Sequence, residues 1–264
     1  MFKIIAQQFV EQYSFLNLFN FITFRVGASI LTSLFFSLIF GQYIINKISK
    51  IQPIGQPIRD DGPENHIIQK AGTPTMGGVL IILSVIISLA LWSDFNNIFI
   101  WIGFLTLIVF GFIGFIDDYN KIKSSSSNGL KARTRIVLQL FFALLISIII
   151  INNINDQIST TISFPFFKNL IVNFGYLYFI ISLFIIVGSA NAVNLTDGLD
   201  GLAIVPVMIV AMTFAFIAYV TGNIVFSDYL LISYIPGTGE LSVLCGSLIG
   251  AALGFLWFNA PPAK

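Results

Sequence analysis

The chain has 264 residues, of which 56% are hydrophobic and only 9% are charged. A soluble domain carries roughly 25% charged residues, so this composition excludes an ordinary water-soluble enzyme and indicates an integral membrane protein. The formal net charge of +1 gives no reason to expect a nucleic-acid partner. Cys245 is the single cysteine, which excludes a disulfide framework and a cysteine-based metal site.

The first 25 residues mix aromatic side chains with Lys3, Glu11 and Arg25. This mixture predicts an interfacial segment that leads into the bilayer, and its polar residues make a cleaved signal peptide a poor expectation. Continuously apolar runs follow, and they approach the roughly 20 residues needed to span a bilayer. We therefore predict an all-α polytopic membrane fold, a single membrane domain over residues 1–264 with about seven transmembrane helices. The predicted spans are residues 26–45, 76–92, 98–116, 136–151, 170–190, 202–220 and 241–258.

The orientation follows from the lysines and arginines, because basic residues favour the cytoplasmic side of a membrane protein. If the first span ends in the cytoplasm, ten of the 13 basic residues lie on cytoplasmic segments. The cytoplasmic loops are then expected near residues 46–75, 117–135 and 191–201. All the motifs with recognisable chemistry fall on these three loops.

The second loop opens with two adjacent carboxylates, Asp117 and Asp118, directly after an uncharged run. An ionised carboxylate is costly in hydrocarbon, so acidic residues at a membrane boundary usually face a polar cavity or a cation. A helix that continues through this stretch would place Lys121 on the same face as Asp117. Carboxylates suit Mg²⁺, and a neighbouring lysine suits a diphosphate. The alternative is a solvated helix end, because adjacent residues on a helix point in different directions.

The first loop contains the string KAGTPTMGG over residues 70–78, which includes Lys70 and Thr75. Glycines and hydroxyls beside a lysine, at the start of a helix, can cradle a phosphate through backbone N–H groups. A Gly/Pro turn entering the second span explains the same string equally well. His66, also on this loop, is interpreted as a solvated residue.

The third loop reads NAVNLTDGLDGLA over residues 191–203, and within it Asn194, Asp197 and Asp200 recur every three residues. One helical turn would stack these side chains on a single face. The string contains no Lys or Arg to neutralise its two carboxylates, which favours a polar cleft over the alternative of a solvated turn. The three loops together predict a cytoplasm-facing site for a polyanionic substrate and a divalent cation. Phosphoryl transfer needs mainly positioning and charge neutralisation, which these residues can supply.

These strings, together with DDYNK at residues 117–121, resemble the phospho-N-acetylmuramoyl-pentapeptide-transferase family, the translocases of peptidoglycan synthesis. The resemblance covers essentially the whole chain. It implies Mg²⁺-dependent transfer of phospho-MurNAc-pentapeptide from UDP-MurNAc-pentapeptide to undecaprenyl phosphate, with lipid I and UMP as products. It also implies a multi-pass protein of the bacterial inner membrane, surrounded by bilayer lipids, with a cytoplasmic active face. A homodimer is a candidate assembly.

The resemblance assigns the catalytic role, and a role in the metal site, to the acidic pair Asp117 and Asp118. Other matching positions are implied to contact the substrates: Lys70, Thr75, Lys121, Asn194, Asp197, Asp200 and Asn259. Arg135 stands where the family has a lysine, and it is left outside the predicted site because guanidinium and ammonium groups differ in geometry.

The end of the chain departs from the family pattern. In the family a string similar to residues 258–264 leads into a third essential aspartate, the main Mg²⁺ ligand, and then into a His-rich loop and further helices. The resemblance therefore places the main Mg²⁺ ligand beyond Lys264, the last residue of the sequence. It predicts that this chain corresponds to the first part of a ten-helix family fold and is truncated at its C-terminus.

Two alternative functions remain open at this stage. A polyprenyl-phosphate GlcNAc-1-phosphate transferase uses the same paired-aspartate arrangement, and the identity of the product would discriminate it. An ion-coupled transporter would hold acidic residues near the bilayer midplane on broken helices. The aspartates of this chain lie instead at predicted cytoplasmic helix ends, which argues against the transporter.

Overall fold

The structure is a computed structural model that describes residues 1–52, 76–124, 129–154, 159–164, 167, 170–197 and 201–260. Its α-helices are α1 (Phe2–Phe9), α2 (Ile22–Ile51), α4 (Gly78–Trp92), α5 (Ile98–Ser124), α6 (Ala132–Asn153), α7 (Leu177–Thr196), α8 (Ile204–Thr221), α9 (Ile224–Leu230) and α10 (Leu241–Asn259). Two short 3₁₀ segments are η1 (Ser14–Asn20) and η2 (Thr238–Glu240). An antiparallel hairpin joins β1 (Thr161–Ser163) to β2 (Ile171–Asn173), with Ile162 paired to Val172. The predicted all-α polytopic membrane fold is confirmed.

Each predicted span contains a helix, but some boundaries differ. Six of the described helices are long and apolar enough to cross a membrane, and α4 is shorter, with 15 residues. The first membrane helix begins at Ile22, so Arg25 lies inside it and not in the segment before it. The fifth begins only at Leu177, because residues 171–173 pair with β1 and Gly175 then turns the chain with a φ of +50°.

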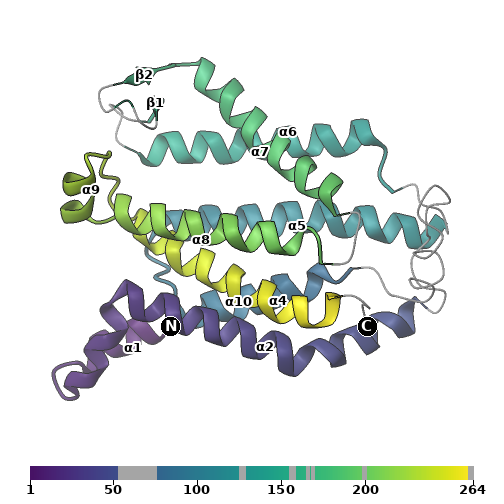
Figure 1. The fold of residues 1–264 in the computed structure, drawn as a ribbon, viewed down its shortest axis with the longest axis horizontal. Helices are drawn as coiled ribbons and strands as arrows, with labels where there is room; N and C mark the ends of the chain where they lie inside the picture. Colours follow the sequence, from purple (N-terminus) through teal and green to yellow (C-terminus); the bar gives the residue numbers. More distant parts are fainter. Residues whose placement is uncertain are drawn as a thin grey trace.

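Helix α10 lies at the centre of the bundle, packed against α2, α4 and α8 (Figure 1). Of its membrane-length window 61% is buried, compared with 28% or less for the other candidate spans. Gly250 lies so close to the carbonyl of Ile30 and the hydroxyl of Ser33 on α2 that a Cβ has no room there. Small residues at such contacts allow the close backbone approach that stabilises membrane helix pairs.

Buried serine hydroxyls connect α2 to α4 in the same core. The hydroxyls of Ser37 and Ser84 lie 2.7 Å apart, and Ser88 donates a hydrogen bond of 2.9 Å to the carbonyl of Ser29. Since lipid tails offer no competing partners, such bonds help to fix the register of the two helices.

Charged groups meet at the end of the bundle that carries α1, α9 and the hairpin (Figure 1). The guanidinium of Arg25 is 1% exposed and donates from Nη1 and Nη2 to the two carboxylate oxygens of Glu240, at 2.7 and 2.5 Å. Lys3 of α1 pairs with Asp94 and lies 3.8 Å from Glu240. This network ties α1 and α2 to the beginning of α10.

At the opposite end of the bundle α2, α5, α7 and α10 finish and α4, α6 and α8 begin (Figure 1). This arrangement brings together the helix ends that flank the three chemistry-bearing loops. Their common location at one end agrees with the predicted alternation of the spans, and it positions the candidate site.

Candidate active site

The acidic pair lies near the end of α5, which continues past the apolar run as far as Ser124. The ammonium of Lys121 lies 2.7 Å from Oδ2 of Asp117 and 3.0 Å from Oδ1 of Asp118. The predicted common face of Asp117 and Lys121 is thus confirmed. The lysine bridges both carboxylates, and its positive charge also suits the C-terminal turn of a helix.

The two aspartates differ in their surroundings. The side chain of Asp117 is 8% exposed and that of Asp118 is 28% exposed. Oδ1 of Asp117 accepts a hydrogen bond of 2.8 Å from the backbone N–H of Leu130, and Gly129 packs so closely on the carboxylate that a Cβ would collide with it. Asp117 is therefore enclosed and oriented, which excludes a solvated helix end at that residue, whereas Asp118 is the more accessible carboxylate.

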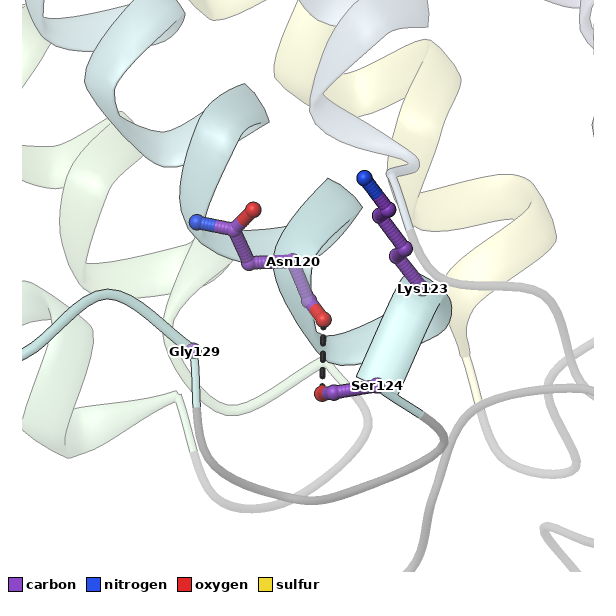
Figure 2. Close-up of a pocket in the computed structure, with 4 residues that line it drawn as sticks. All are labelled: Asn120, Lys123, Ser124 and Gly129. Carbon is purple, nitrogen blue, oxygen red and sulfur yellow. Dashed lines mark hydrogen bonds between the residues drawn. The ribbon is translucent and has the colours of Figure 1, made fainter.

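An open pocket of about 370 Å³ is lined by Asn120, Lys123, Ser124 and Gly129 (Figure 2), and Gly129 connects it to the carboxylate of Asp117, on which it packs. The hydroxyl of Ser124 donates a hydrogen bond of 2.7 Å to the carbonyl of Asn120, shown as the dashed line in Figure 2. The amide of Asn120 and the ammonium of Lys123 extend from the last turns of α5. An ammonium and an amide next to two carboxylates form a polar surface suited to phosphate groups and a cation.

The third loop is described only as far as Asp197 and again from Gly201. Helix α7 includes Asn191 and Asn194 but ends at Thr196, and Asp197 follows it with a non-helical ψ of 57°. The N–H of Asp197 still donates a hydrogen bond of 3.1 Å to the carbonyl of Val193, so Asn194 and Asp197 share a face at the end of the helix, whereas Asp200 lies outside the described residues. Asn194 and Asp197 are both exposed.

Two residues of α6 that were not in the predicted site contact the polar end of α7. Nη1 of Arg135 donates to Oδ1 of Asn194 at 3.3 Å, and Nδ2 of Asn191 donates to Oε1 of Gln139 at 2.7 Å. Gln139 is 6% exposed. The signal that could have found it is a glutamine inside the otherwise apolar run 136–151, because polar side chains within membrane helices usually have a specific partner.

The first loop is described only from Met76 onward, so the predicted residues Lys70 and Thr75, together with His66, lie outside the described residues. Gly77, at the start of α4, packs against the ring of Phe255 on α10, where a Cβ would collide. One glycine of the KAGTPTMGG string therefore has a packing role at this end of the bundle.

The last residues of the sequence are described only in part. Asn259, the final residue of α10, is half-buried. Lys264 lies outside the described residues, and the main Mg²⁺ ligand of the family was placed beyond it. The position of that ligand therefore stays a prediction, and the predicted metal ligands among the described residues are Asp117 and Asp118.

The acidic pair can be tested for its fit to the predicted divalent cation, Mg²⁺. Within the described ranges, no group of three or more His, Cys, Asp or Glu side chains could hold a metal ion. Mg²⁺ needs fewer protein ligands, since it commonly takes one or two carboxylates together with water and substrate phosphates. Asp117, Asp118 and Lys121 carry a formal charge of −1 together, which would repel a polyanionic substrate, and a divalent cation would reverse that sign. The pair therefore fits Mg²⁺, with Asp118 as the more accessible ligand.

A bundle of membrane helices with a lysine-bridged aspartate pair at one end has the features of a polytopic membrane phosphoglycosyl transferase. Comparison with known proteins agrees with this class. The family model for glycosyl transferase family 4 matches residues 100–264, and the model for phospho-N-acetylmuramoyl-pentapeptide-transferase signature 1 matches residues 70–82. A Pelagibacter ubique (strain HTCC1062) protein named phospho-N-acetylmuramoyl-pentapeptide-transferase is 54% identical over 263 residues, which cover 98% of this chain and 72% of the relative. The chain belongs to the phospho-N-acetylmuramoyl-pentapeptide-transferase family.

Proposed function

We propose that the protein transfers phospho-MurNAc-pentapeptide from UDP-MurNAc-pentapeptide to undecaprenyl phosphate, with lipid I and UMP as products. The observation that carries the proposal is the Lys121 bridge between Asp117 and Asp118, beside an open pocket, in a chain of this family. The name of the Pelagibacter ubique relative favours this substrate over GlcNAc-1-phosphate. The transporter alternative is not favoured, because the acidic pair lies near the end of an unbroken α5.

The reaction joins two polyanions. An oxygen of the lipid phosphate forms a bond to the β-phosphorus of the UDP-linked substrate. The bond from that phosphorus to the oxygen bridging the α-phosphate breaks, and UMP leaves with this oxygen and the electron pair. The protein therefore has to hold two phosphate groups together, orient them in line and offset their charge.

The contacts of the acidic pair suggest a division of roles. Asp118, the more accessible carboxylate, orients the lipid phosphate or accepts its proton. Asp117, held by Leu130 and Lys121, fixes the lysine ammonium where it can stabilise charge on the diphosphate. A bound Mg²⁺ held by Asp118 and Asp117 would supply further neutralisation of phosphate charge.

The remaining predicted contacts keep their proposed roles on the nucleotide side of the site. Three of these residues belong to the described part of the chain, and their helix ends lie at the same end of the bundle as the acidic pair (Figure 1). The full set is Lys70, Thr75, Asn194, Asp197, Asp200 and Asn259. We further propose a location in the bacterial inner membrane with this end in the cytoplasm, supported by the distribution of basic residues. The homodimer remains a prediction.

The proposal is tested by lipid I formation from UDP-MurNAc-pentapeptide and undecaprenyl phosphate by the purified protein, with Mg²⁺ and with excess chelator. We expect turnover only with the metal, and a loss of about 10²- to 10⁴-fold in kcat in Asp118→Asn. Asp228→Asn, which changes an exposed carboxylate on α9 at the opposite end, serves as the matched control. Full activity of Asp118→Asn would overturn the proposal, as would turnover of UDP-GlcNAc, supplied in a parallel reaction, without turnover of UDP-MurNAc-pentapeptide.

A further inference from the structure

Helix α7 carries the NAVNLT part of the third motif and is weakly anchored in the bundle. None of its residues is buried. Among the described elements its packing is chiefly against α6. The positions of Asn194 and Asp197 are therefore determined mainly by how α7 sits on α6.

The contact that holds the polar end of α7 on α6 is the pair Gln139 and Asn191. Oε1 of Gln139 accepts a hydrogen bond of 2.7 Å from Nδ2 of Asn191, which also donates to the carbonyl of Val187 at 2.8 Å. Both N–H groups of this amide are thus used, so its orientation is defined. Because Gln139 is buried, water cannot readily replace the bond if it breaks. About one helical turn from this pair, near the beginning of α6 and the end of α7, Arg135 donates a longer hydrogen bond of 3.3 Å to Asn194.

Helix α6 is itself connected to the acidic pair. It begins shortly after Leu130, whose backbone N–H holds Asp117. A continuous route therefore runs from Asp117 through Leu130 into α6, and from Gln139 into α7. Through these two hydrogen bonds, α6 is held in position against both the acidic pair and the third motif.

We propose that Gln139 is a positioning residue for substrate binding. By holding Asn191, it sets the register of α7 on α6 and so places Asn194 and Asp197 at the correct distance from the Asp117–Asp118 pair. The inference rests on the proposed function for the identity of the ligand that these two residues contact, the uridine nucleotide substrate.

The first test compares Gln139→Leu with a matched control in the same helix pair. Ser147→Ala removes the hydroxyl contact of 2.9 Å between buried Ser147 of α6 and Ser182 of α7, deeper in the bundle. We expect Gln139→Leu to raise the KM for UDP-MurNAc-pentapeptide about tenfold, consistent with the loss of one buried hydrogen bond. The KM for undecaprenyl phosphate and the kcat should change much less, and Ser147→Ala should leave both KM values unchanged. Gln139→Glu, which keeps an acceptor for Asn191, should restore most of the nucleotide KM.

Equal changes of the nucleotide KM in Gln139→Leu and Ser147→Ala would overturn the proposal, since the contact would then be only structural. A change in kcat without a change in KM would do the same.

A second test needs no activity. Spin labels are placed on the exposed ends of α6 and α7 through Arg133→Cys and Leu195→Cys, in a Cys245→Ala background. Gln139→Leu should broaden the distribution of distances between the labels, and Ser147→Ala should not. An unchanged distribution in Gln139→Leu would overturn the positioning role. If the unmutated protein made no lipid I, the proposed function would fail while this measurement would still report on the register of α7.

Discussion

The backbone N–H of Leu130 donates a hydrogen bond of 2.8 Å to Oδ1 of Asp117. The bond connects the beginning of α6 to a carboxylate near the end of α5. With Lys121 on its other oxygen, Asp117 is held from two directions. Asp118 is left as the accessible member of the pair, and Gly129 and Leu130, just before α6, take part in the geometry of the candidate site.

Gly129 is the position at which this geometry can be tested without changing a charge. In Gly129→Ala the new methyl group would collide with the carboxylate of Asp117, so either the carboxylate or Leu130 has to move. We expect the rate of lipid I formation to fall about 10- to 100-fold, because small misplacements of catalytic groups are costly. The thermal stability of the detergent-solubilised protein should change little. Gly114→Ala on α5 is the control, since an added Cβ there meets no atom within 4 Å; an equal loss of activity in both variants would contradict the prediction.

Removing one charge of the buried pair Arg25 and Glu240 is expected to lower the stability of the protein strongly. Glu240→Gln leaves the Arg25 guanidinium buried and without its countercharge, which typically costs about 3–5 kcal/mol. The double variant Arg25→Met with Glu240→Gln removes the charge as well and should cost less than the single variant. The free energy of unfolding in mixed micelles checks both values. A double variant less stable than Glu240→Gln would show that the pair does not act through charge compensation.

The sequence predicted the helices well because lipid imposes a simple rule, that a spanning segment has to be apolar and satisfy its own backbone. The rule does not define helix ends. The run 170–190 contains no charged residue, yet residues 171–173 form β2, because the partner strand and the turn at Gly175 are not encoded in hydropathy. Arg25 was predicted to be interfacial because its partner, Glu240, is 215 residues away in the chain.

In the candidate site, contacts within one helix could be predicted from the sequence and contacts between helices could not. The spacing of Asp117 and Lys121 within one helix was enough to predict their contact, since it depends only on helical periodicity. The contacts of Asp117 with Leu130 and of Gln139 with Asn191 depend on how separate helices meet, which no local pattern specifies. The predicted common face is present for Asn194 and Asp197, because the N–H of Asp197 still bonds to the carbonyl of Val193, and its extension to Asp200 stays a prediction.

Gly250 tests the close approach of α10 to α2. Its hypothetical Cβ would meet the carbonyl of Ile30, a backbone atom that cannot turn away as a side chain can. We expect Gly250→Ala to destabilise the protein by about 1–3 kcal/mol, the usual cost of overpacking. Gly27→Ala on α2 is the control because an added Cβ there meets nothing within 4 Å, and it should leave stability unchanged or higher. If the two variants have the same unfolding free energy, the α2–α10 contact is looser than the structure indicates.

Asp94, in the loop between α4 and α5, pairs with Lys3 of α1, so we expect the docking of α1 to depend on the protonation of Asp94. Burial by itself would raise its pKa, but hydrogen bonds from Lys3 and from the backbone of Asn96, with the charges of Lys3 and Arg25, hold the pKa of Asp94 below its ordinary value of 3.8. Because the folded state lowers this pKa, the stabilisation is fully present above the ordinary value and is lost as pH falls through the lower, folded-state pKa.

The docking of α1 can be followed through Trp92, whose ring centroid lies 4.9 Å from that of Phe2. With Trp101→Phe and Trp257→Phe in the background, acidification below about pH 4 should shift the emission of Trp92 as α1 detaches. Asp94→Asn should show the detached signal already at neutral pH and lose this part of the pH dependence. Asp228→Asn, an exposed carboxylate on α9, should behave like the unmutated protein. An asparagine at position 94 can still accept the backbone hydrogen bond from residue 96, but it cannot form the ion pair with Lys3. An acid transition that persists unchanged in Asp94→Asn would therefore mean that another group docks α1.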